Sequence, residues 1–209
     1  MARPIRSSLS ESSLIMMGVP KKFVNKTIDD FKDYGSEELA EVKEYIIDYI
    51  NHIPDNMEEN KGIFFYGANG VGKSFLSSII LKEFYRHRYS SRRVTFAQYI
   101  TEYTRVWDYR GDEKDMIESD FYARYKAVEF LLIEEIGKEI DSKIAKPILE
   151  DLLRYREEHG LVTLICTNMT PRDIKDSYGA SICSLINGNM TVIVIDSEDM
   201  RQEVFNGEL

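Results

Sequence analysis

Residues 67–74 read Gly67-Ala68-Asn69-Gly70-Val71-Gly72-Lys73-Ser74, and this stretch matches the pattern G-x-x-x-x-G-K-[ST] in full. Glycines let the backbone curl tightly, so successive N–H groups point inward at the oxygens of a bound phosphate. A helix that begins near Lys73 adds the positive end of its dipole. We expect Lys73 to reach the β- and γ-phosphates of a nucleotide and the Ser74 hydroxyl to bind Mg²⁺. Residues 67–74 and the adjacent Phe75 are the predicted nucleotide contacts.

The sequence on either side of this loop supports the phosphate-binding interpretation. Ile63-Phe64-Phe65-Tyr66 is a short apolar run with strand character, and apolar residues repeat at helical spacing from Leu76 to Phe84. A strand that leads into the glycines and a helix that leaves them is the context in which the pattern holds phosphate. The alternative, a glycine-rich turn before an ordinary helix with a capping lysine, explains less of this arrangement.

A second apolar strand supplies the acidic residues that hydrolysis needs. Phe130-Leu131-Leu132-Ile133 runs directly into Glu134-Glu135. In the usual pattern, an aspartate at the first acidic position holds Mg²⁺ through its water shell, and the glutamate after it polarises the attacking water. Glu134 takes the first position with a side chain one methylene longer, and Glu135 takes the second. The alternative is that two charges simply end a strand at the solvent.

A polar residue also follows the apolar strand predicted over residues 161–166. Asn168 stands just after that strand, and a strand between the other two would bring its side chain to the γ-phosphate or the lytic water. An asparagine before a turn is also ordinary loop chemistry, so both interpretations stay open. The predicted catalytic residues are Lys73, Glu134, Glu135 and Asn168, and the predicted metal contacts are Ser74 and Glu134.

Strands that alternate with helices along the chain predict a parallel sheet covered by helices on both faces. This is the three-layer α/β architecture of P-loop nucleotide-binding proteins. We expect a flexible tail or a short partner-binding segment over residues 1–17, a helical lead-in over residues 18–61 and the nucleotide-binding core over residues 62–209. A polar connection is expected over residues 54–61 and a turn over residues 111–114.

The composition limits the class of protein further. A chain of 209 residues that is 43% hydrophobic has enough apolar residues for one folded domain. Two cysteines cannot build a disulfide framework, and the apolar run at residues 14–17 is far too short to span a membrane. We therefore expect a cytoplasmic protein with no membrane partner. A net charge of −9 and a pI near 5.0 argue against a surface that attracts nucleic acid generally.

One basic cluster nevertheless stands out in this acidic chain. Arg86, Arg88, Arg92 and Arg93 lie close together in the sequence, with tyrosines beside them. The cluster predicts a strip that follows the phosphates of single-stranded DNA while the tyrosines stack on its bases. The alternative is a solvated helix end, where basic residues interact favourably with the helix dipole.

Together these motifs resemble the DnaC/IstB-like branch of the AAA+ ATPases, which comprises bacterial and phage helicase loaders and transposition helper ATPases. The resemblance runs from about Gly18 to Arg201. The segments that carry it are Gly18-Val19-Pro20-Lys21-Lys22-Phe23, Thr27-Ile28-Asp29-Asp30-Phe31, residues 62–74, residues 131–139, Thr167-Asn168-Met169-Thr170-Pro171 and residues 192–196.

The resemblance implies an ATPase that uses ATP and Mg²⁺, loads or regulates a replicative helicase on single-stranded DNA, and self-associates into a ring or spiral. A transposition helper and a nucleotide-dependent assembly switch with little hydrolysis remain alternatives. A GTPase is disfavoured because the chain has no Asn-Lys-x-Asp motif to read guanine. A nucleotide kinase is disfavoured because no lid or acceptor site can be identified.

Two departures from the family pattern bear on hydrolysis. Glu134 stands where the family usually has aspartate. After Tyr178-Gly179 the family tends to carry arginines, one of which reaches into the neighbouring subunit's site, and this chain has Ser181 and Leu185 at those places. An arginine of that kind contributes about 10³–10⁵ in rate in comparable systems. We therefore expect slow hydrolysis by the chain alone, with Arg172 as a weak substitute.

Overall fold

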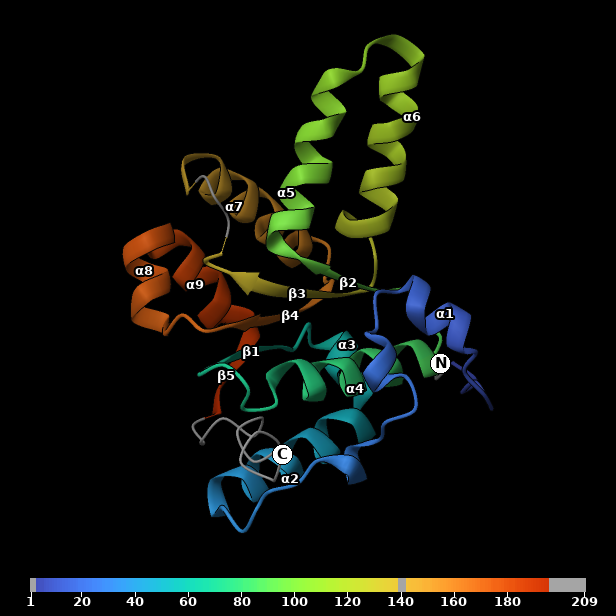
Figure 1. Ribbon diagram of the computed structural model, residues 1–209. Coiled ribbons are helices and arrows are strands. Elements are labelled where there is room, and N and C mark those ends of the chain that lie inside the picture. The colour runs from blue at the N-terminus through green and yellow to red at the C-terminus, as the bar shows by residue number, and fades with distance from the viewer. Residues whose placement is uncertain (1–2, 139–141, 196–209) are drawn as a thin grey trace, which may run out of the picture.

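A five-stranded parallel sheet forms the centre of the computed structural model, which describes residues 3–138 and 142–195. The strand order is β2-β3-β4-β1-β5 (Figure 1). The strands are β1 (Gly62–Gly67), β2 (Ser91–Thr95), β3 (Phe130–Ile136), β4 (Val162–Thr167) and β5 (Met190–Ile195). This architecture confirms the predicted three-layer α/β fold. Arg201, at the end of the family resemblance, lies outside the described residues.

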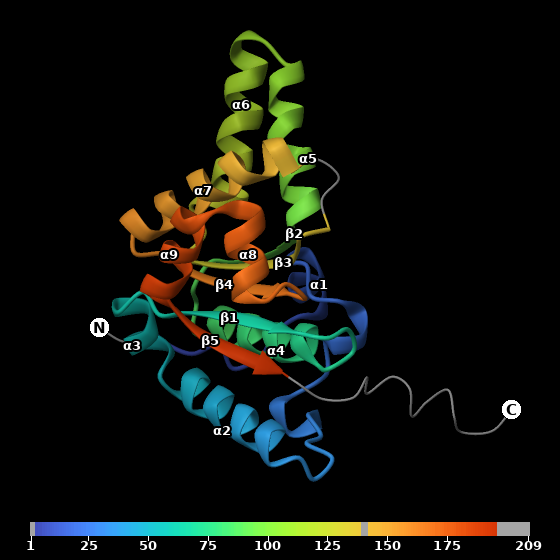
Figure 2. The same ribbon diagram turned by 90° about the vertical axis from the view of Figure 1, so that its left-hand side faces the viewer.

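Helices cover both faces of this sheet (Figures 1 and 2). One layer contains α1 (Glu11–Met16), α2 (Glu37–Asn51) and α4 (Lys73–Arg86), and the other contains α5 (Phe96–Arg105), α7 (Ser142–Glu158), α8 (Pro171–Tyr178) and α9 (Ala180–Asn189). The helix α6 (Gly111–Phe121) pairs with α5 in a hairpin that projects away from the sheet. In the part of the chain that the structure describes, no helix combines the length and apolar character needed to cross a membrane.

The strand sequences explain why both faces are covered. Successive side chains on a strand point to opposite faces, so a strand that is apolar throughout must be buried on both sides. In β1, Ile63 and Phe65 pack in the core beside α2 and α4, and Phe64 packs in the core beside α7 and α9. All three are fully buried. The apolar run that precedes the glycine loop is thus the centre of the molecule.

Several helices begin at residues whose side chains satisfy the first free backbone N–H groups. The Ser36 hydroxyl accepts a hydrogen bond from the Leu39 N–H at 3.3 Å, which starts α2 as expected. Thr95 and Thr170 form capping boxes at the start of α5 and α8. These caps place α5 directly after β2, and they place α8 shortly after the end of β4.

Two predicted loops are helical in the structure. Residues 54–61 were expected to form a polar connection, but α3 (Ile53–Glu58) lies there, because Ile53 is fully buried and Pro54 fits the first helical turn. Residues 111–114 were expected to form a turn, but α6 begins at Gly111, where Asp112 and Glu113 suit the positive end of the helix dipole.

Residues 11–17 of the predicted flexible tail form α1 with its C-cap and pack on the core. Leu14 and Met17 are buried, and α1 packs against the same core as α4. The Met17 carbonyl accepts a hydrogen bond at 2.8 Å from the N–H of Arg93 on the edge strand β2. Apolar side chains and an unpaired strand edge together hold this segment on the molecule.

Sheet topology determines where the site forms. In this order β4 lies between β3 and β1 and pairs with both of them in parallel. The carboxyl ends of β1, β3 and β4 therefore meet at one edge of the sheet, and residues that follow these three strands become neighbours. In open α/β sheets this edge is the ordinary place for a ligand.

Candidate nucleotide-binding site

The glycine loop of residues 67–74 connects β1 to α4, as predicted. Gly70 and Gly72 have φ angles of +88° and +97°, a left-handed conformation that residues with a Cβ rarely adopt. Val71 is fully buried and anchors the loop in the core. The Lys73 ammonium donates to the carbonyl of Gly67 at 2.8 Å and to that of Ala68, so it lies over the loop. The free N–H groups at the start of α4 and this ammonium suit a bound polyphosphate.

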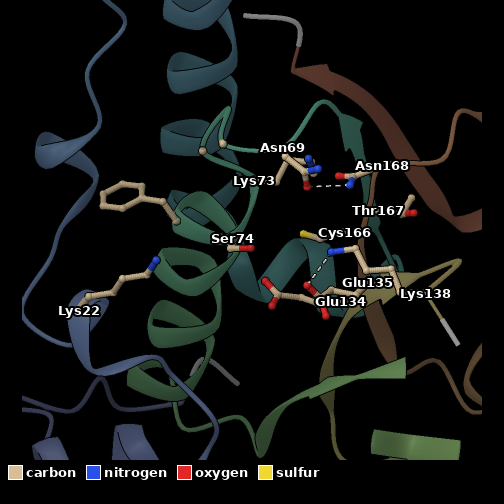
Figure 3. Close-up of a pocket in the computed structure, with 13 residues that line it drawn as sticks. Lys22, Asn69, Lys73, Ser74, Glu134, Glu135, Lys138, Cys166, Thr167 and Asn168 are labelled. Atoms are coloured by element: carbon tan, nitrogen blue, oxygen red, sulfur yellow. Dashed lines mark hydrogen bonds and ion pairs between the residues drawn. The ribbon is translucent and has the colours of Figure 1, made fainter. Parts of the chain in front are cut away.

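Glu134 lies deep on the α4 side of the sheet, and its side chain is 3% exposed. Its Oε2 pairs with the guanidinium of Arg93 on β2, and its Oε1 lies 3.4 Å from the hydroxyl of Ser77. Ser77 stands one helical turn after Ser74, so the Glu134 carboxylate and the Ser74 hydroxyl both face the pocket (Figure 3). Its burial contradicts the alternative in which Glu134 ends a strand at the solvent.

The Glu135 side chain points away from that of Glu134 because β3 has a bulge at Glu135. The register between β3 and β4 shifts between Glu134 and Ile136, and Glu135 has a φ of +62°, which is unusual for a residue other than glycine. Its side chain is 49% exposed and forms an ion pair with Lys138 at 2.9 Å (Figure 3). The bulge thus separates two adjacent glutamates, placing Glu134 against α4 and Glu135 at the mouth of the pocket.

Asn168 follows β4 and reaches the tip of the glycine loop. Its Nδ2 donates a hydrogen bond to the Oδ1 of Asn69 at 2.8 Å (Figure 3). The central position of β4 between β3 and β1 brings these residues together across 99 positions of sequence. The location expected for Asn168 agrees with this arrangement, and its contact with phosphate or water stays a prediction.

These groups surround one pocket of about 250 Å³. Its lining includes most of the glycine loop, Phe75, both glutamates and Asn168, and four residues that had not been assigned to the site: Lys22, Lys138, Cys166 and Thr167. Burial and the Glu134 carboxylate raise the pKa of the Cys166 thiol, so this cysteine stays protonated. Nothing in the local sequence around Lys22 signals its place, because the contact depends on how the N-terminal segment packs.

Hard oxygen donors are the ligands that Mg²⁺ prefers, and the Ser74 hydroxyl and Glu134 carboxylate provide them on one wall. Among the described residues, no group of three His, Cys, Asp or Glu side chains is placed to hold a metal ion. A cation here would therefore take most of its ligands from phosphate oxygens and water, as Mg²⁺ commonly does. The residues present fit Mg²⁺ bound together with a nucleotide.

Lys82 connects the phosphate loop to the N-terminal wall of the pocket. It lies on α4, and its buried ammonium donates hydrogen bonds to the carbonyls of Phe23, Val24 and Lys26. These carbonyls lie at the end of the short helix η1 (Lys21–Phe23) and just after it, and η1 carries Lys22 to the pocket. The Phe23 ring contacts Phe75 edge-on at 5.5 Å between centroids. One helix thus holds both the loop and the opposite wall.

We expect Lys82→Met to lower the free energy of unfolding by about 1–3 kcal/mol, because several carbonyl groups lose their buried donor. Chemical denaturation measures the change. Lys26→Met is the matched control, since the Lys26 side chain forms a partly exposed pair with Asp30 and should contribute no more than about 1 kcal/mol. Equal losses in the two variants would contradict the assigned role of Lys82.

The four arginines predicted to contact DNA all have partners within the fold. Those partners are Glu83 for Arg86, the Pro4 carbonyl for Arg88, the Met16 carbonyl for Arg92, and Glu134 with the Gly18 carbonyl for Arg93. The side chains of Arg88, Arg92 and Arg93 therefore hold the N-terminal segment against the core, whereas Arg86 pairs within its own helix. DNA binding by this strip stays a prediction, and the sequence around Arg93 did not indicate its contact with Glu134.

The positions where the family pattern has arginines lie on α9. Leu185 is buried in the core there, and the Ser181 hydroxyl donates to Glu150 at 2.7 Å. The guanidinium of Arg154, on α7, reaches the Ser181 hydroxyl at 2.6 Å. Arg172 on α8 is exposed and lies 3.9 Å from Asp176. The contact of Arg154 with Ser181 spans 27 residues, so local sequence patterns gave no sign of it.

The sequence is similar to those of bacterial replicative helicase loaders. No protein-family model matches the sequence. The chain is 26% identical over 121 residues to the replicative helicase loader DnaI of Bacillus subtilis, a match that covers 57% of the chain and 37% of that protein. It is 22% identical over 195 residues to the replicative helicase loader DnaC of Buchnera aphidicola subsp. Schizaphis graminum, covering 91% of the chain and 75% of that protein. The chain thus spans a little over a third of the Bacillus protein's length.

Solved structures share the fold at low sequence identity. A crystal structure of the DnaC helicase loader gives a TM-score of 0.73 at 20% identity, over 84% of this chain and 99% of that one. The crystal structure of DnaI gives a TM-score of 0.67 at 19% identity, over 86% of this chain and 95% of that one. The structure of the replication initiator DnaA bound to AMPPCP and single-stranded DNA gives a TM-score of 0.66 at 18% identity, over 92% of this chain and 58% of that one. In sequence the chain is similar to DnaI and DnaC helicase loaders, and it shares the fold of the DnaC, DnaI and DnaA structures.

Proposed function

We propose that the chain binds ATP with Mg²⁺ in this pocket, hydrolyses it slowly, and loads or regulates a replicative helicase on single-stranded DNA. The observation that carries the proposal is the convergence of the glycine loop, Glu134, Glu135 and Asn168 on one pocket. The names of the DnaI and DnaC relatives support the helicase role and do not favour a transposition helper. The DnaA structure with AMPPCP supports nucleotide binding by this fold.

Each polar residue of the pocket then has a task. Lys73 and the loop N–H groups bind the phosphates, while the Ser74 hydroxyl and the Glu134 carboxylate hold the cation. Bound Mg²⁺ supplies charge neutralisation on the phosphate oxygens. Glu135 orients the attacking water and accepts its proton, and Asn168 donates a hydrogen bond to the γ-phosphate or the water. The positions of these side chains around the pocket support the proposed roles.

Two features support slow hydrolysis by the isolated chain. The Glu135 carboxylate is paired with Lys138, and that interaction must rearrange before Glu135 can accept a proton. The family's arginine positions hold Ser181 and the buried Leu185, so that source of charge stabilisation is missing. A partner or a second subunit would have to supply the remaining positive charge. The isolated protein should turn over ATP much more slowly than its complex with the helicase.

The helicase role is tested with the purified chain and the replicative helicase of the same cell. We expect the chain with ATP and Mg²⁺ to increase the amount of helicase retained on closed circular single-stranded DNA. Lys73→Ala should remove the increase. Affinity purification from the native cell with ATP present supplies an independent check. Recovery of a transposase without the helicase, or no effect on helicase retention, would contradict the proposed role.

A further inference from the structure

The Arg93 guanidinium contacts the carboxylate of Glu134, the acid proposed above to hold Mg²⁺. In the parallel pairing of β2 with β3, Thr95 is opposite Glu134. Arg93 stands two residues before Thr95 on β2, so its side chain lies on the same face of the sheet as that of Glu134. The Arg93 side chain is 20% exposed and that of Glu134 is 3% exposed, so the ion pair is largely shielded from solvent. The Arg93 Nη2 donates to Glu134 Oε2, which leaves Oε1 on the side of Ser77.

We propose that Arg93 is a positioning residue that fixes the Glu134 carboxylate for Mg²⁺. The inference rests on the nucleotide site proposed above and deepens it. A glutamate has one more rotatable bond than the aspartate usual at this position, so holding its carboxylate in one orientation costs more side-chain entropy. A guanidinium is planar and always charged, and its charge-assisted hydrogen bonds are directional. Arg93 thereby holds the longer Glu134 side chain in one orientation of its carboxylate.

Arg93 is itself held at both its backbone and its side chain. Its N–H donates to the Met17 carbonyl at 2.8 Å, and its Nη1 donates to the Gly18 carbonyl at 3.1 Å. Gly18 has a φ of +97°, and a Cβ at this residue would lie 2.8 Å from the Arg93 carbonyl oxygen. Only glycine allows the two backbones to approach this closely. The segment at residues 17–18 therefore clamps the arginine that holds Glu134.

The competing possibility is that Arg93 merely neutralises Glu134 and competes with the cation. The two possibilities predict opposite effects of removing the guanidinium. If Arg93 positions the carboxylate, its loss weakens the cation site, as removal of an outer partner of a metal ligand typically does by about 10–100-fold. If Arg93 competes, its loss leaves a buried negative charge that attracts Mg²⁺ more strongly.

The test compares ATP affinity in Mg²⁺ with ATP affinity in EDTA, using a fluorescent ATP analogue. We expect Arg93→Met to reduce the ratio of these affinities by about tenfold or more while affinity in EDTA stays near the wild-type value. Arg93→Lys keeps the charge without the planar fork and should give an intermediate ratio. If Arg93→Met does not fold, as judged by circular dichroism, Arg93→Lys is used in its place. The ratio of ATP affinity in Mg²⁺ to ATP affinity in EDTA should then be several-fold below that of the wild type.

Arg92→Met is the matched control, because the Arg92 guanidinium donates to the Met16 carbonyl and stands next to Arg93 on β2. It loosens the same N-terminal segment and should leave the ratio unchanged. An unchanged or larger ratio in Arg93→Met, or an equal decrease in Arg92→Met, would overturn the positioning role. A wild-type chain that does not bind ATP would instead contradict the proposed function.

Discussion

Lys73→Ala is expected to abolish measurable ATP binding. The lysine ammonium lies over the glycine loop, bonded to the Gly67 and Ala68 carbonyls, and it can turn from them to bind phosphate oxygens. Two hydrogen bonds from the ammonium to charged phosphate oxygens of ATP would contribute about 1.5–3 kcal/mol each, so losing both would cost about 3–6 kcal/mol of binding free energy. This corresponds to about a 10²–10⁴-fold loss of affinity. Isothermal titration calorimetry with ATP and Mg²⁺ measures the change.

Lys138→Ala is the control for this experiment. Lys138 also lines the pocket, but its ammonium pairs with Glu135 at the rim. We expect its removal to change ATP affinity by no more than about fivefold, because an exposed ion pair contributes at most about 1 kcal/mol. Thermal unfolding should show that both variants are folded. Wild-type affinity in Lys73→Ala would contradict the assignment of the phosphate loop.

The second large effect is expected for Glu135→Gln. Glutamine has nearly the same shape but cannot accept the proton of the attacking water, and a positioned base contributes about 10²–10⁴ in rate. We expect hydrolysis to fall by about this factor while ATP affinity stays within about threefold of wild type. The variant should fold normally, since the Glu135 side chain is 49% exposed. A phosphate-release assay under saturating ATP measures the rate.

This experiment also distinguishes an ATPase from an assembly switch that hardly hydrolyses ATP. Equal rates near zero in the wild type and in Glu135→Gln, with helicase retention intact in both, would contradict a catalytic role for Glu135. A fall in rate with helicase retention preserved or prolonged would support coupling of hydrolysis to release. The measurement is best made with the helicase present, because the isolated chain is expected to turn over slowly.

The sequence predicted the features that depend on local spacing and strand order. The glycine loop follows from eight consecutive residues, and the acidic strand end follows from an apolar run that stops at Glu134. Asn168 was placed near the loop because strands alternating with helices imply a parallel sheet whose carboxyl ends meet. The structure brings these residues together around one pocket, as expected from that topology.

The sequence did not predict contacts made by long side chains across large separations. Arg93 was grouped with its basic neighbours, although its partner Glu134 lies 41 positions later. The sequence pattern assigned no contact to Lys82, although its ammonium binds carbonyls nearly 60 positions earlier. The bulge at Glu135 also has no signal in the apolar pattern, because bulges depend on the register with a neighbouring strand. Such features depend on packing that a single sequence does not reveal.

The attachment of residues 17–18 to β2 has a consequence for solubility. β2 is an edge strand of the sheet, and an uncovered strand edge is a template on which other chains can add strands and aggregate. The Met17 carbonyl occupies the Arg93 N–H, so the N-terminal segment shields this edge. A protein shortened to begin after Gly18 would expose that edge together with the apolar surface that Leu14 now covers. We therefore expect residues 14–18 to hinder the addition of a foreign strand at the β2 edge.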